Sequence, residues 1–472
     1  MKSLVELSAA RVVKLLRRGE VTPLELLDAL EARIAEVDGA VNALPTLCFE
    51  RAGTAARQLM RKRPEKRGRL AGLPVAIKDL MDVGGVRTTS GSLVFRDRVP
   101  ERSDIMVERL EANGAVIYAK SNTPEFGAGA NTFNEVFGRT LNPWNTALSA
   151  GGSSGGAAAA LATGMAWLAH GSDMAGSLRT PASFCGVVGF RPSPGRVAAT
   201  PGFRIDDTIS VEGPMARSVT DVTLFLDAMT GAHPADPISF DTEPDGFAAG
   251  LRRGNRPKRI AFSSDLGVTP VDPEVAAITR RAALHFRELG IEVEEAHPDL
   301  GDSHECFGVI RARNFAISYH HLLADHRADI KPEVVWNIEQ GLKITADDMI
   351  RAERQRSGMF RHAIEFLGRY DLLLAPAAIV PPYPVGERYV ETCGGKRFAN
   401  YYEWLAIAYA ITLLALPVVA IPCGFTRAGL PVGLQIVGPP RGEAAVLRAA
   451  AMLETLLGRS ALPIDPRPGP AS

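Results

Sequence analysis

Residues 150–190 read AGGSSGGAAAALATGMAWLAHGSDMAGSLRTPASFCGVVGF, and this segment is the most informative part of the chain. Its glycines permit backbone angles that other residues avoid, and the alanine run behind the first glycines predicts a helix. A tight turn at Ala175-Gly176-Ser177 would expose a hydroxyl and point consecutive backbone N–H groups at one place, as an oxyanion hole requires. We therefore expect a glycine-rich loop, a helix and a serine-bearing turn in succession.

Strand and helix patterns alternate on both sides of this segment. On the N-terminal side, residues 4–36 predict two helices, the second with a capping sequence at Thr22-Pro23-Leu24-Glu25. AGLPVAIKDL (71–80) predicts a short buried strand, and residues 102–126 predict a helix, a glycine stop and a strand. On the C-terminal side the predicted strands are KRIAFSSDLG (258–267), YDLLLAPAA (370–378), VVAIPCGF (418–425) and VGLQIVG (432–438), and a helix begins at Glu443.

This alternation predicts an α/β fold, a single large domain with a central, mostly parallel or mixed, twisted β-sheet covered by helices on both faces. We expect residues 1–60 to form an N-terminal helical segment packed on the core, and residues 61–472 to form the main domain. Residues 232–258 are rich in Pro, Asp and Gly without periodicity, which predicts a surface connection.

The composition is that of a folded globular protein, with 46% hydrophobic and 22% charged residues. Because 53 basic residues balance 53 acidic ones, the net charge gives no reason to expect a nucleic acid or an anionic membrane as a partner. The basic run RQLMRKRPEKRGR (57–69) predicts a solvated helix end and loop rather than a polyanion site. The five scattered cysteines have neither disulfide-framework nor zinc-ligand spacing, and we expect no metal and no cofactor.

Two segments bear on cellular location. The N-terminus carries charges throughout its amphipathic pattern and lacks the apolar core of a signal peptide. The apolar stretch WLAIAYAITLLALPVVAIP (404–422) approaches the length of a membrane span, but Pro417 divides it into a helix-like half and a strand-like half. We therefore expect a cytoplasmic protein that does not span a membrane.

Lys78 and the glycine-rich loop suggest chemistry without identifying it. A lysine at the mouth of a buried strand is partly desolvated, which lowers its pKa and makes it available as a base, unless it simply pairs with Asp79 or Asp82. The loop lacks the Lys-Ser/Thr of a phosphate-binding P-loop. It matches G-x-S-x-G at 151–155 and 152–156, but NPWNTALSA (142–150) has poor strand formers where a nucleophile elbow needs a strand.

Taken together, these features resemble the amidase signature family, whose hallmark is a GGSSGG loop followed closely by a G-(S/T)-D-x-x-G-S-(I/L)-R turn. The loop falls on residues 151–156 and the turn, GSDMAGSLR, on residues 171–179. From roughly residue 60 to the C-terminus the resemblance also covers LPVAIKD (73–79), TTSGS (88–92), SNTPEF (121–126), FGRTLNPW (137–144), GPMARSV (213–219), LLLAP (372–376) and LPVGLQIVG (430–438). It implies the amidase signature fold and hydrolysis of a carboxamide bond.

Carried over residue by residue, the resemblance implies a Ser–Ser–Lys triad. Lys78 corresponds to the base, Ser153 to the relay that the family holds with an unusual cis peptide bond, and Ser177 to the nucleophile that forms an acyl-enzyme. The remaining roles are oxyanion donation by the backbone N–H groups of Met174, Ala175, Gly176 and Ser177, lining of the acyl or leaving group by Gly127, fixing of the turn by Asp173 and bracing of the loop by Arg179.

The chain departs from the family pattern at two places near the triad. Ala175 stands where many members have glycine, but only its N–H is needed, so activity should survive. His170 stands where members have an aliphatic or small residue, and we expect it to pack in the core rather than to contact the active-site backbone.

The expected substrate is a small-molecule amide with an apolar or aryl group. A second possibility is the glutaminase A subunit of a tRNA-dependent amidotransferase, which shares these motifs, but the position of its substrate-gripping Asp falls on Leu405 in an apolar sequence. An α/β-hydrolase-type esterase, which needs an essential histidine, and an inactive binding scaffold are also possible. The oligomeric state is left open between a monomer and a homodimer.

No motif between residues 300 and 410 identifies the substrate. The aromatic and histidine residues of that region either line an aromatic cavity or fill the core. They are Tyr319, His320, His321, Trp336, Tyr401, Tyr402 and Trp404.

Overall fold

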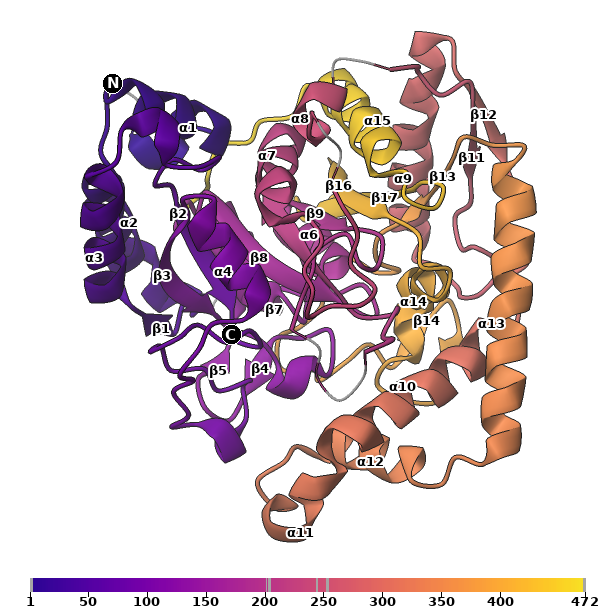
Figure 1. Ribbon diagram of the computed structural model, residues 1–472. Coiled ribbons are helices and arrows are strands. Elements are labelled where there is room, and N and C mark those ends of the chain that lie inside the picture. Colours follow the sequence, from indigo (N-terminus) through magenta and orange to yellow (C-terminus); the bar gives the residue numbers. More distant parts are fainter. Residues whose placement is uncertain (1–2, 201, 203–204, 243–244, 252–253, 470–472) are drawn as a thin grey trace.

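The computed structural model describes residues 3–200, 202, 205–242, 245–251 and 254–469 (Figure 1). One 11-stranded sheet crosses the molecule in the order β1-β3-β2-β8-β10-β9-β16-β17-β13-β11-β12. The strands are β1 (Thr46–Leu47), β2 (Pro74–Lys78), β3 (Val116–Ser121), β8 (Leu168–Asp173), β9 (Val188–Arg191), β10 (Val211–Ala216), β11 (Arg259–Phe262), β12 (Glu292–Glu295), β13 (Leu372–Pro376), β16 (Val418–Phe425) and β17 (Pro431–Val437). The strand β2 runs parallel to β3 and β8, whereas β10, β16 and β17 run antiparallel to their neighbours. The sheet is therefore mixed.

Both faces of the sheet are covered. Every residue of β2, β3, β13 and β17 is buried, and because successive side chains point to opposite faces, water reaches neither face there. The helices α7 (Val219–Met229) and α15 (Glu443–Leu456) pack on each other and on the sheet, and α5 (Gly155–Ala162) and α6 (Arg179–Cys185) do the same. These observations confirm the predicted α/β fold.

The alanine-rich helix α5 brings the glycine-rich loop against the sheet. All eight of its residues are buried, because glycine and alanine allow a helix to approach the strands closely. At Gly156 the approach is so close that a Cβ would overlap the backbone of Asn122, which follows β3. The loop before α5 consequently lies beside the C-terminal ends of β2 and β3.

Residues 3–60 pack on this core. They form the helices α1 (Ala9–Arg18), α2 (Pro23–Val37) and α3 (Phe49–Met60), and β1 at the edge of the sheet. The predicted capping box between Thr22 and Glu25 is present at the start of α2. One hydrophobic cluster includes residues from this segment and from α15, so the two parts share a core.

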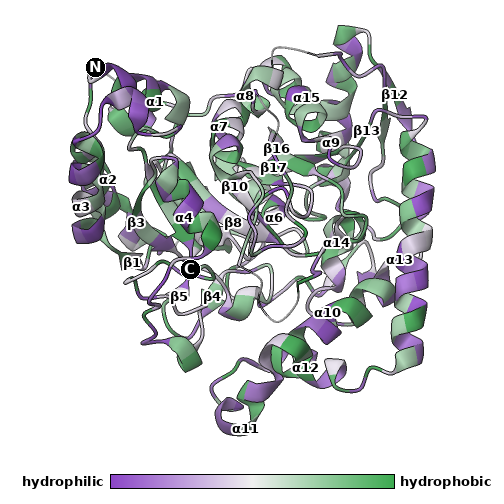
Figure 2. Cartoon of the chain, in the orientation of Figure 1, coloured by the Kyte–Doolittle hydropathy of each residue, from purple (hydrophilic) through white to green (hydrophobic). Residues whose placement is uncertain are grey.

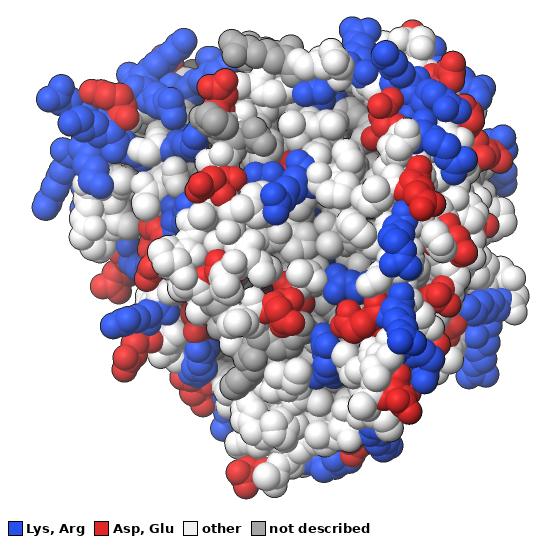
Figure 3. Space-filling view, turned by 45° about the vertical axis from the view of Figure 1, so that its right-hand side comes forward, with Lys and Arg blue, Asp and Glu red and all other residues white. Residues whose placement is uncertain are grey.

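The basic run is exposed as predicted. The helix α3 ends at Met60, and the following Arg61, Lys62 and Arg63 point into solvent. On the face drawn in Figure 3, basic side chains gather at the upper left, whereas acidic and basic side chains are intermixed on the right.

Residues 300–368 and 403–413, which flank β13 in the sequence, form a helical layer beside the sheet. It contains α10 (Ser303–Tyr319), α11 (Leu323–His326), α12 (Pro332–Gly341), α13 (Ala346–Leu367), η8 (Glu403–Leu405) and α14 (Ala406–Leu413). In Figure 2 the outer helix α13 mixes hydrophilic and hydrophobic residues along its length, as a helix with one solvated face does. The apolar stretch 404–422 divides into η8, α14 and β16 as predicted, and no helix of the described residues is long and apolar enough to cross a membrane.

Two local expectations need correction. Residues 141–149 form a hairpin of β6 (Leu141–Asn142) and β7 (Asn145–Ser149), in which the intervening residues turn and the polar strand residues pair outside the main sheet. The connection 232–258 is largely exposed in its described parts, but it includes the short helix α8 (Phe247–Gly250), whose Phe247 is buried in the core. The remaining elements are α4 (Ile105–Ala112), α9 (Pro273–Leu284), and the small pairs β4 (Phe133–Asn134) with β5 (Gly138–Arg139) and β14 (Thr392–Cys393) with β15 (Lys396–Arg397).

Candidate active site

Lys78 is the last residue of β2, and its side chain is fully buried. Its Nζ lies 2.7 Å from Ser153 Oγ. It also lies 3.0 Å from Ser154 Oγ and 3.0 Å from Ser172 Oγ. The predicted contact with Ser153 is therefore present, and two further hydroxyls complete a ring of three around the amine.

Neither Asp79 nor Asp82 pairs with Lys78, although both follow it closely in the sequence. Asp79 Oδ1 lies 3.3 Å from Lys120 Nζ, and Asp82 forms an ion pair with Arg98. The simpler interpretation of Lys78 as an ordinary ion-paired lysine is therefore wrong.

Burial lowers the pKa of Lys78 to about 7, although the nearby carboxylates of Glu212 and Asp173 act in the opposite direction. Removing an ammonium from water disfavours its charged form, and hydroxyl groups replace only part of that hydration. The lowered pKa favours the free amine of Lys78 near neutral pH. That amine has a lone pair that can take a proton from the hydroxyl 2.7 Å away.

Ser153 and Ser177 come from two loops that meet at one cavity. The peptide bond between Gly152 and Ser153 is cis, and the Ser153 side chain is buried. Ser177 is half-buried just before α6, and its carbonyl accepts a hydrogen bond of 3.3 Å from the Ser154 N–H. A Cβ at Gly127 would lie 3.5 Å from Ser153 Oγ. Ser153, Ser177 and Gly127 line the same cavity.

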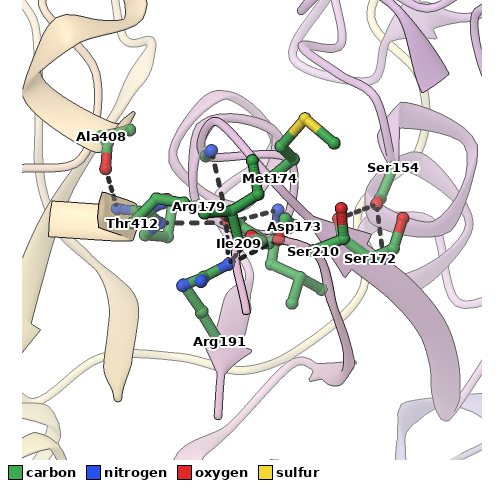
Figure 4. A network of polar contacts seen from close by, with 12 residues as sticks. Ser154, Ser172, Asp173, Met174, Arg179, Arg191, Ile209, Ser210, Ala408 and Thr412 are labelled. Atoms are coloured by element: carbon green, nitrogen blue, oxygen red, sulfur yellow. Dashed lines mark hydrogen bonds and ion pairs between the residues drawn. The ribbon is translucent and has the colours of Figure 1, made fainter. Parts of the chain in front are cut away.

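The carboxylate of Asp173, at the end of β8, fixes the serine-bearing turn (Figure 4). It accepts hydrogen bonds from the backbone N–H groups of Gly176 at 3.0 Å and Leu178 at 3.1 Å. It also forms buried ion pairs with Arg179 at 2.9 Å and Arg191 at 3.3 Å. Burial alone would raise the pKa of Asp173, but the two arginines hold it well below its usual range, so the carboxylate stays ionised.

Arg179 connects this turn to α14 and β17. Besides Asp173, its fully buried guanidinium donates to the Ala408 carbonyl at 2.9 Å, to Thr412 Oγ1 at 2.9 Å and to Gln435 Oε1 at 3.0 Å. A rigid, planar donor with so many partners holds the turn against two other elements.

The four expected oxyanion donors differ in whether the backbone N–H group already donates a hydrogen bond within the turn. The Gly176 N–H is engaged by the turn's own carboxylate. The N–H groups of Met174, Ala175 and Ser177 are thus the candidates that remain for an oxyanion, and all three residues line the cavity. Gly176 has a φ of +100°, and a Cβ there would lie 2.7 Å from Ala408 Cβ, so the position requires glycine.

His170 in β8 is fully buried and also contacts the active-site backbone. Its Nδ1 accepts a hydrogen bond of 3.4 Å from the Lys78 N–H, and its Nε2 lies 2.7 Å from the Glu212 carboxylate. An imidazole whose Nδ1 accepts must carry its proton on Nε2, which then donates to Glu212. The expectation that His170 packs in the core is right, but the expectation that it avoids the active-site backbone is wrong.

The cavity beside these loops has a volume of about 210 Å³. We call its two sides the catalytic wall, formed by the loops at 151–156 and 171–179, and the α10 wall, formed by α10 and residues 401–405. The apolar groups around it include Phe126, Phe315, Tyr319, Tyr401, Tyr402 and Leu405.

Four of the seven aromatic and histidine residues singled out in the 300–410 region have one of the two expected roles, and the three exposed ones have neither. Tyr319, Tyr401 and Tyr402 line the cavity. Trp404 is fully buried in a hydrophobic cluster, and Trp336 is 36% exposed. Neither His320 nor His321 is among the residues around the cavity.

Of the charged residues that line the cavity, Asp173 is predicted from the sequence and three others are not. These three are Arg311, Asp207 and Glu212. The one available signal was an arginine within the otherwise apolar run CFGVIRA (306–312) of a predicted helical region. Within the part of the chain that the structure describes, no three His, Cys, Asp or Glu side chains are grouped as metal ligands.

Residues 25–447 match the Amidase family. The chain belongs to the amidase signature family. An acylamidase of Rhodococcus erythropolis is 34% identical over 457 residues, which cover 95% of each protein. The A subunit of the glutamyl-tRNA(Gln) amidotransferase of Moorella thermoacetica is 34% identical over 486 residues, covering 95% of this chain and 96% of the subunit.

The solved structure of a bacterial aryl acylamidase of the amidase signature family superposes on this chain with a TM-score of 0.90 and 27% sequence identity, covering 96% of both chains. The expected family and fold are therefore confirmed, and the chain is an amidase signature enzyme. This finding excludes two of the alternatives stated above, the α/β-hydrolase-type esterase and the inactive binding scaffold.

Proposed function

We propose that this amidase hydrolyses a carboxamide bond by a Ser–Ser–Lys mechanism with an acyl-enzyme on Ser177. The observation that carries the proposal is the buried contact of 2.7 Å between Lys78 Nζ and Ser153 Oγ, next to a cavity that Ser153 and Ser177 both line. A serine hydroxyl is a weak nucleophile until its proton is removed, and a lysine with a lowered pKa is able to accept that proton.

The reaction starts with the free amine of Lys78. The amine takes the Ser153 proton as Ser153 takes the Ser177 proton, and Ser177 Oγ bonds to the amide carbon. The backbone N–H groups of the turn stabilise the resulting oxyanion. The proton then returns through Ser153 to the substrate nitrogen, the C–N bond breaks, and ammonia or an amine leaves. A water molecule repeats the sequence on the acyl-enzyme and releases the carboxylate.

The substrate proposed is an amide with an apolar or aryl group. The rings of Phe126, Tyr319 and Tyr402 around the cavity support an apolar part, as does the similarity to an acylamidase and to an aryl acylamidase. The glutaminase A subunit is the second candidate, because the similarity to such a subunit is equally high. Leu405 in the cavity wall favours the first candidate, because an apolar side chain at that position cannot replace the hydration of a glutamine ammonium group.

Two adjacent serines offer a matched test of the relay. Both Ser153 and Ser154 contact Lys78, at 2.7 and 3.0 Å, but only Ser153 is among the residues that line the cavity. Ser153→Ala should therefore lower kcat/KM for an anilide by about three decades or more, whereas Ser154→Ala should lower it by about tenfold. Equal losses, or a larger loss in Ser154→Ala, would contradict the relay.

A panel of anilides, primary amides and glutamine, read by released amine or ammonia, tests the substrate class. Mass spectrometry after rapid acid quenching should show the acyl group on Ser177 and none in Ser177→Ala. Light scattering of the purified chain distinguishes a monomer from a homodimer. Glutamine hydrolysis that appears only with added partner subunits would favour the A-subunit candidate instead.

A further inference from the structure

The α10 wall contains one buried cation, Arg311, in the middle of α10. The residue is 4% exposed, and it lines the cavity together with Ser177. Its Nη2 donates to Tyr401 Oη at 2.6 Å, and its Nη1 approaches Met174 Sδ at 3.2 Å. The buried Nε has no hydrogen-bond partner. Among the described residues, no carboxylate forms an ion pair with this guanidinium.

These contacts alone leave the buried charge of Arg311 poorly compensated. Burying a charge is costly unless it is paired and hydrogen-bonded, and a thioether is only a weak acceptor. The ring of Phe315, with its centroid 4.5 Å from the guanidinium carbon, offsets part of that cost, as do Tyr401 and Tyr402 at 5.5 Å. The rings also hold the guanidinium in place without satisfying its N–H groups.

The acidic residues of the cavity have other partners. Glu212 lies 2.7 Å from His170 Nε2. Asp207 accepts hydrogen bonds from the backbone N–H groups of Ile209 and Ser210, at 2.9 and 3.3 Å. The guanidinium is thus the one charge of these three whose partner is missing from the described chain. Its planar fork fits a carboxylate through two parallel N–H donors.

The position of Arg311 relative to the proposed nucleophile, Ser177, also bears on what Arg311 binds. Met174, which Arg311 touches, lies three positions before Ser177 in the same turn. A molecule held by Arg311 therefore lies beside the turn that carries the nucleophile. We infer that Arg311 binds a carboxylate of the substrate, so that this amidase acts on amides that combine an apolar part with an anionic end. The inference rests on the proposed function, because the carboxylate belongs to the amide that is cleaved.

The carboxylate has two possible sources, the acyl part or the amine part of the substrate. The monoanilide of glutaric acid represents the first, and N-benzoyl-β-alanine represents the second. Each has a neutral partner of the same shape in which an isopropyl group replaces the carboxylate. The wild-type enzyme should prefer the carboxylate member of one pair by about 100-fold in kcat/KM, as expected for a charged hydrogen-bonded pair.

Arg311→Met should abolish that preference, because kcat/KM for the carboxylate member should fall by far more than kcat/KM for its neutral partner. Arg311→Lys should restore only part of it, because an ammonium cannot form the two parallel bonds. The matched control is Arg313→Met on the same helix, since Arg313 faces Glu353 at 3.7 Å and does not line the cavity. It should retain the full preference. No preference in wild type, or equal losses for both partners in Arg311→Met, would overturn the inference.

Binding separates this inference from the proposed reaction. Calorimetry on Ser177→Ala should show that the favoured carboxylate amide binds about 100-fold tighter than its neutral partner. If wild type cleaves none of the four amides, the proposed reaction fails, and equal binding of the two partners would then also overturn the role of Arg311. Competitive inhibition of the wild-type enzyme by glutarate also measures whether the cavity binds a carboxylate. This measurement does not depend on how the Arg311 variant folds.

Discussion

The catalytic wall and the α10 wall face the same cavity but differ in the partners of their charged side chains. On the catalytic wall Asp173 pairs with two arginines, and beside it three hydroxyls surround the amine of Lys78. On the α10 wall Arg311 is held by aromatic rings and one hydroxyl, and its Nε has no partner. We interpret this difference as follows: the catalytic groups find their partners within the chain, whereas Arg311 takes a carboxylate of the substrate as its partner.

The structural origin of the two walls explains this difference. The catalytic wall stands at the ends of buried strands and close to a helix of small residues, where little movement is possible. The α10 wall consists of long side chains on helices outside the sheet, which can change without disturbing the strands. Substitutions in the catalytic wall should therefore affect kcat and stability, and those in the α10 wall should affect KM.

The largest effect is expected from Lys78→Met, which keeps the volume of the side chain but removes the base. The rate should fall by about four decades, as for other residues of a catalytic unit, because neither serine can then lose its proton. Binding of a substrate carboxylate to Arg311 should be unchanged. Turnover of an anilide and calorimetric binding of glutarate check the two parts, and a rate within tenfold of wild type would contradict the proposed base.

Asp173→Asn should reduce both stability and rate. It leaves Arg179 and Arg191 buried without a counterion, which costs about 3–5 kcal/mol in the free energy of unfolding. Urea unfolding measures this loss. The control is Glu305→Gln at the exposed ion pair with Arg351, which should leave the free energy of unfolding nearly unchanged because exposed pairs contribute little. Similar losses in both variants would contradict the expected contribution of the buried ion pairs of Asp173.

The pH profile tests the role of Lys78 without replacing that residue. In the proposed mechanism the neutral amine is the active form, so kcat/KM should fall as the pH decreases through about 7. Glu212 raises the pKa of Lys78, and Glu212→Gln should therefore move the acid limb to lower pH and change the rate by less than about tenfold at any pH. Asp207→Asn, at another acid of the cavity, should leave the acid limb in place. An identical limb in wild type and Glu212→Gln would contradict this electrostatic coupling.

Much of the fold and the catalytic wall is predictable from the sequence for local reasons. The strands β2, β13, β16 and β17 are short apolar runs, and Ser153 and Ser177 belong to contiguous motifs. The strand β8 was not predicted, because LAHGSD contains small and polar residues whose pairing depends on both neighbouring strands. Arg311 and Glu212 meet the site from separate elements and belong to no recognisable pattern, so only the folded arrangement identifies them.

The smallest effect is expected from Tyr401→Phe, which keeps the ring beside Arg311 and removes only its hydroxyl. That hydroxyl accepts hydrogen bonds from Arg311 Nη2, at 2.6 Å, and from Asn337. Without it the guanidinium is less firmly oriented, and KM for the favoured carboxylate amide should rise about three- to tenfold, with kcat within about twofold of wild type. Tyr402→Phe is the matched control, because its ring lies at the same 5.5 Å but the hydrogen bonds of Arg311 go to Met174 and Tyr401. Equal changes in KM would mean that the rings alone orient the guanidinium, and a fall in kcat would mean that the α10 wall also positions the reacting bond.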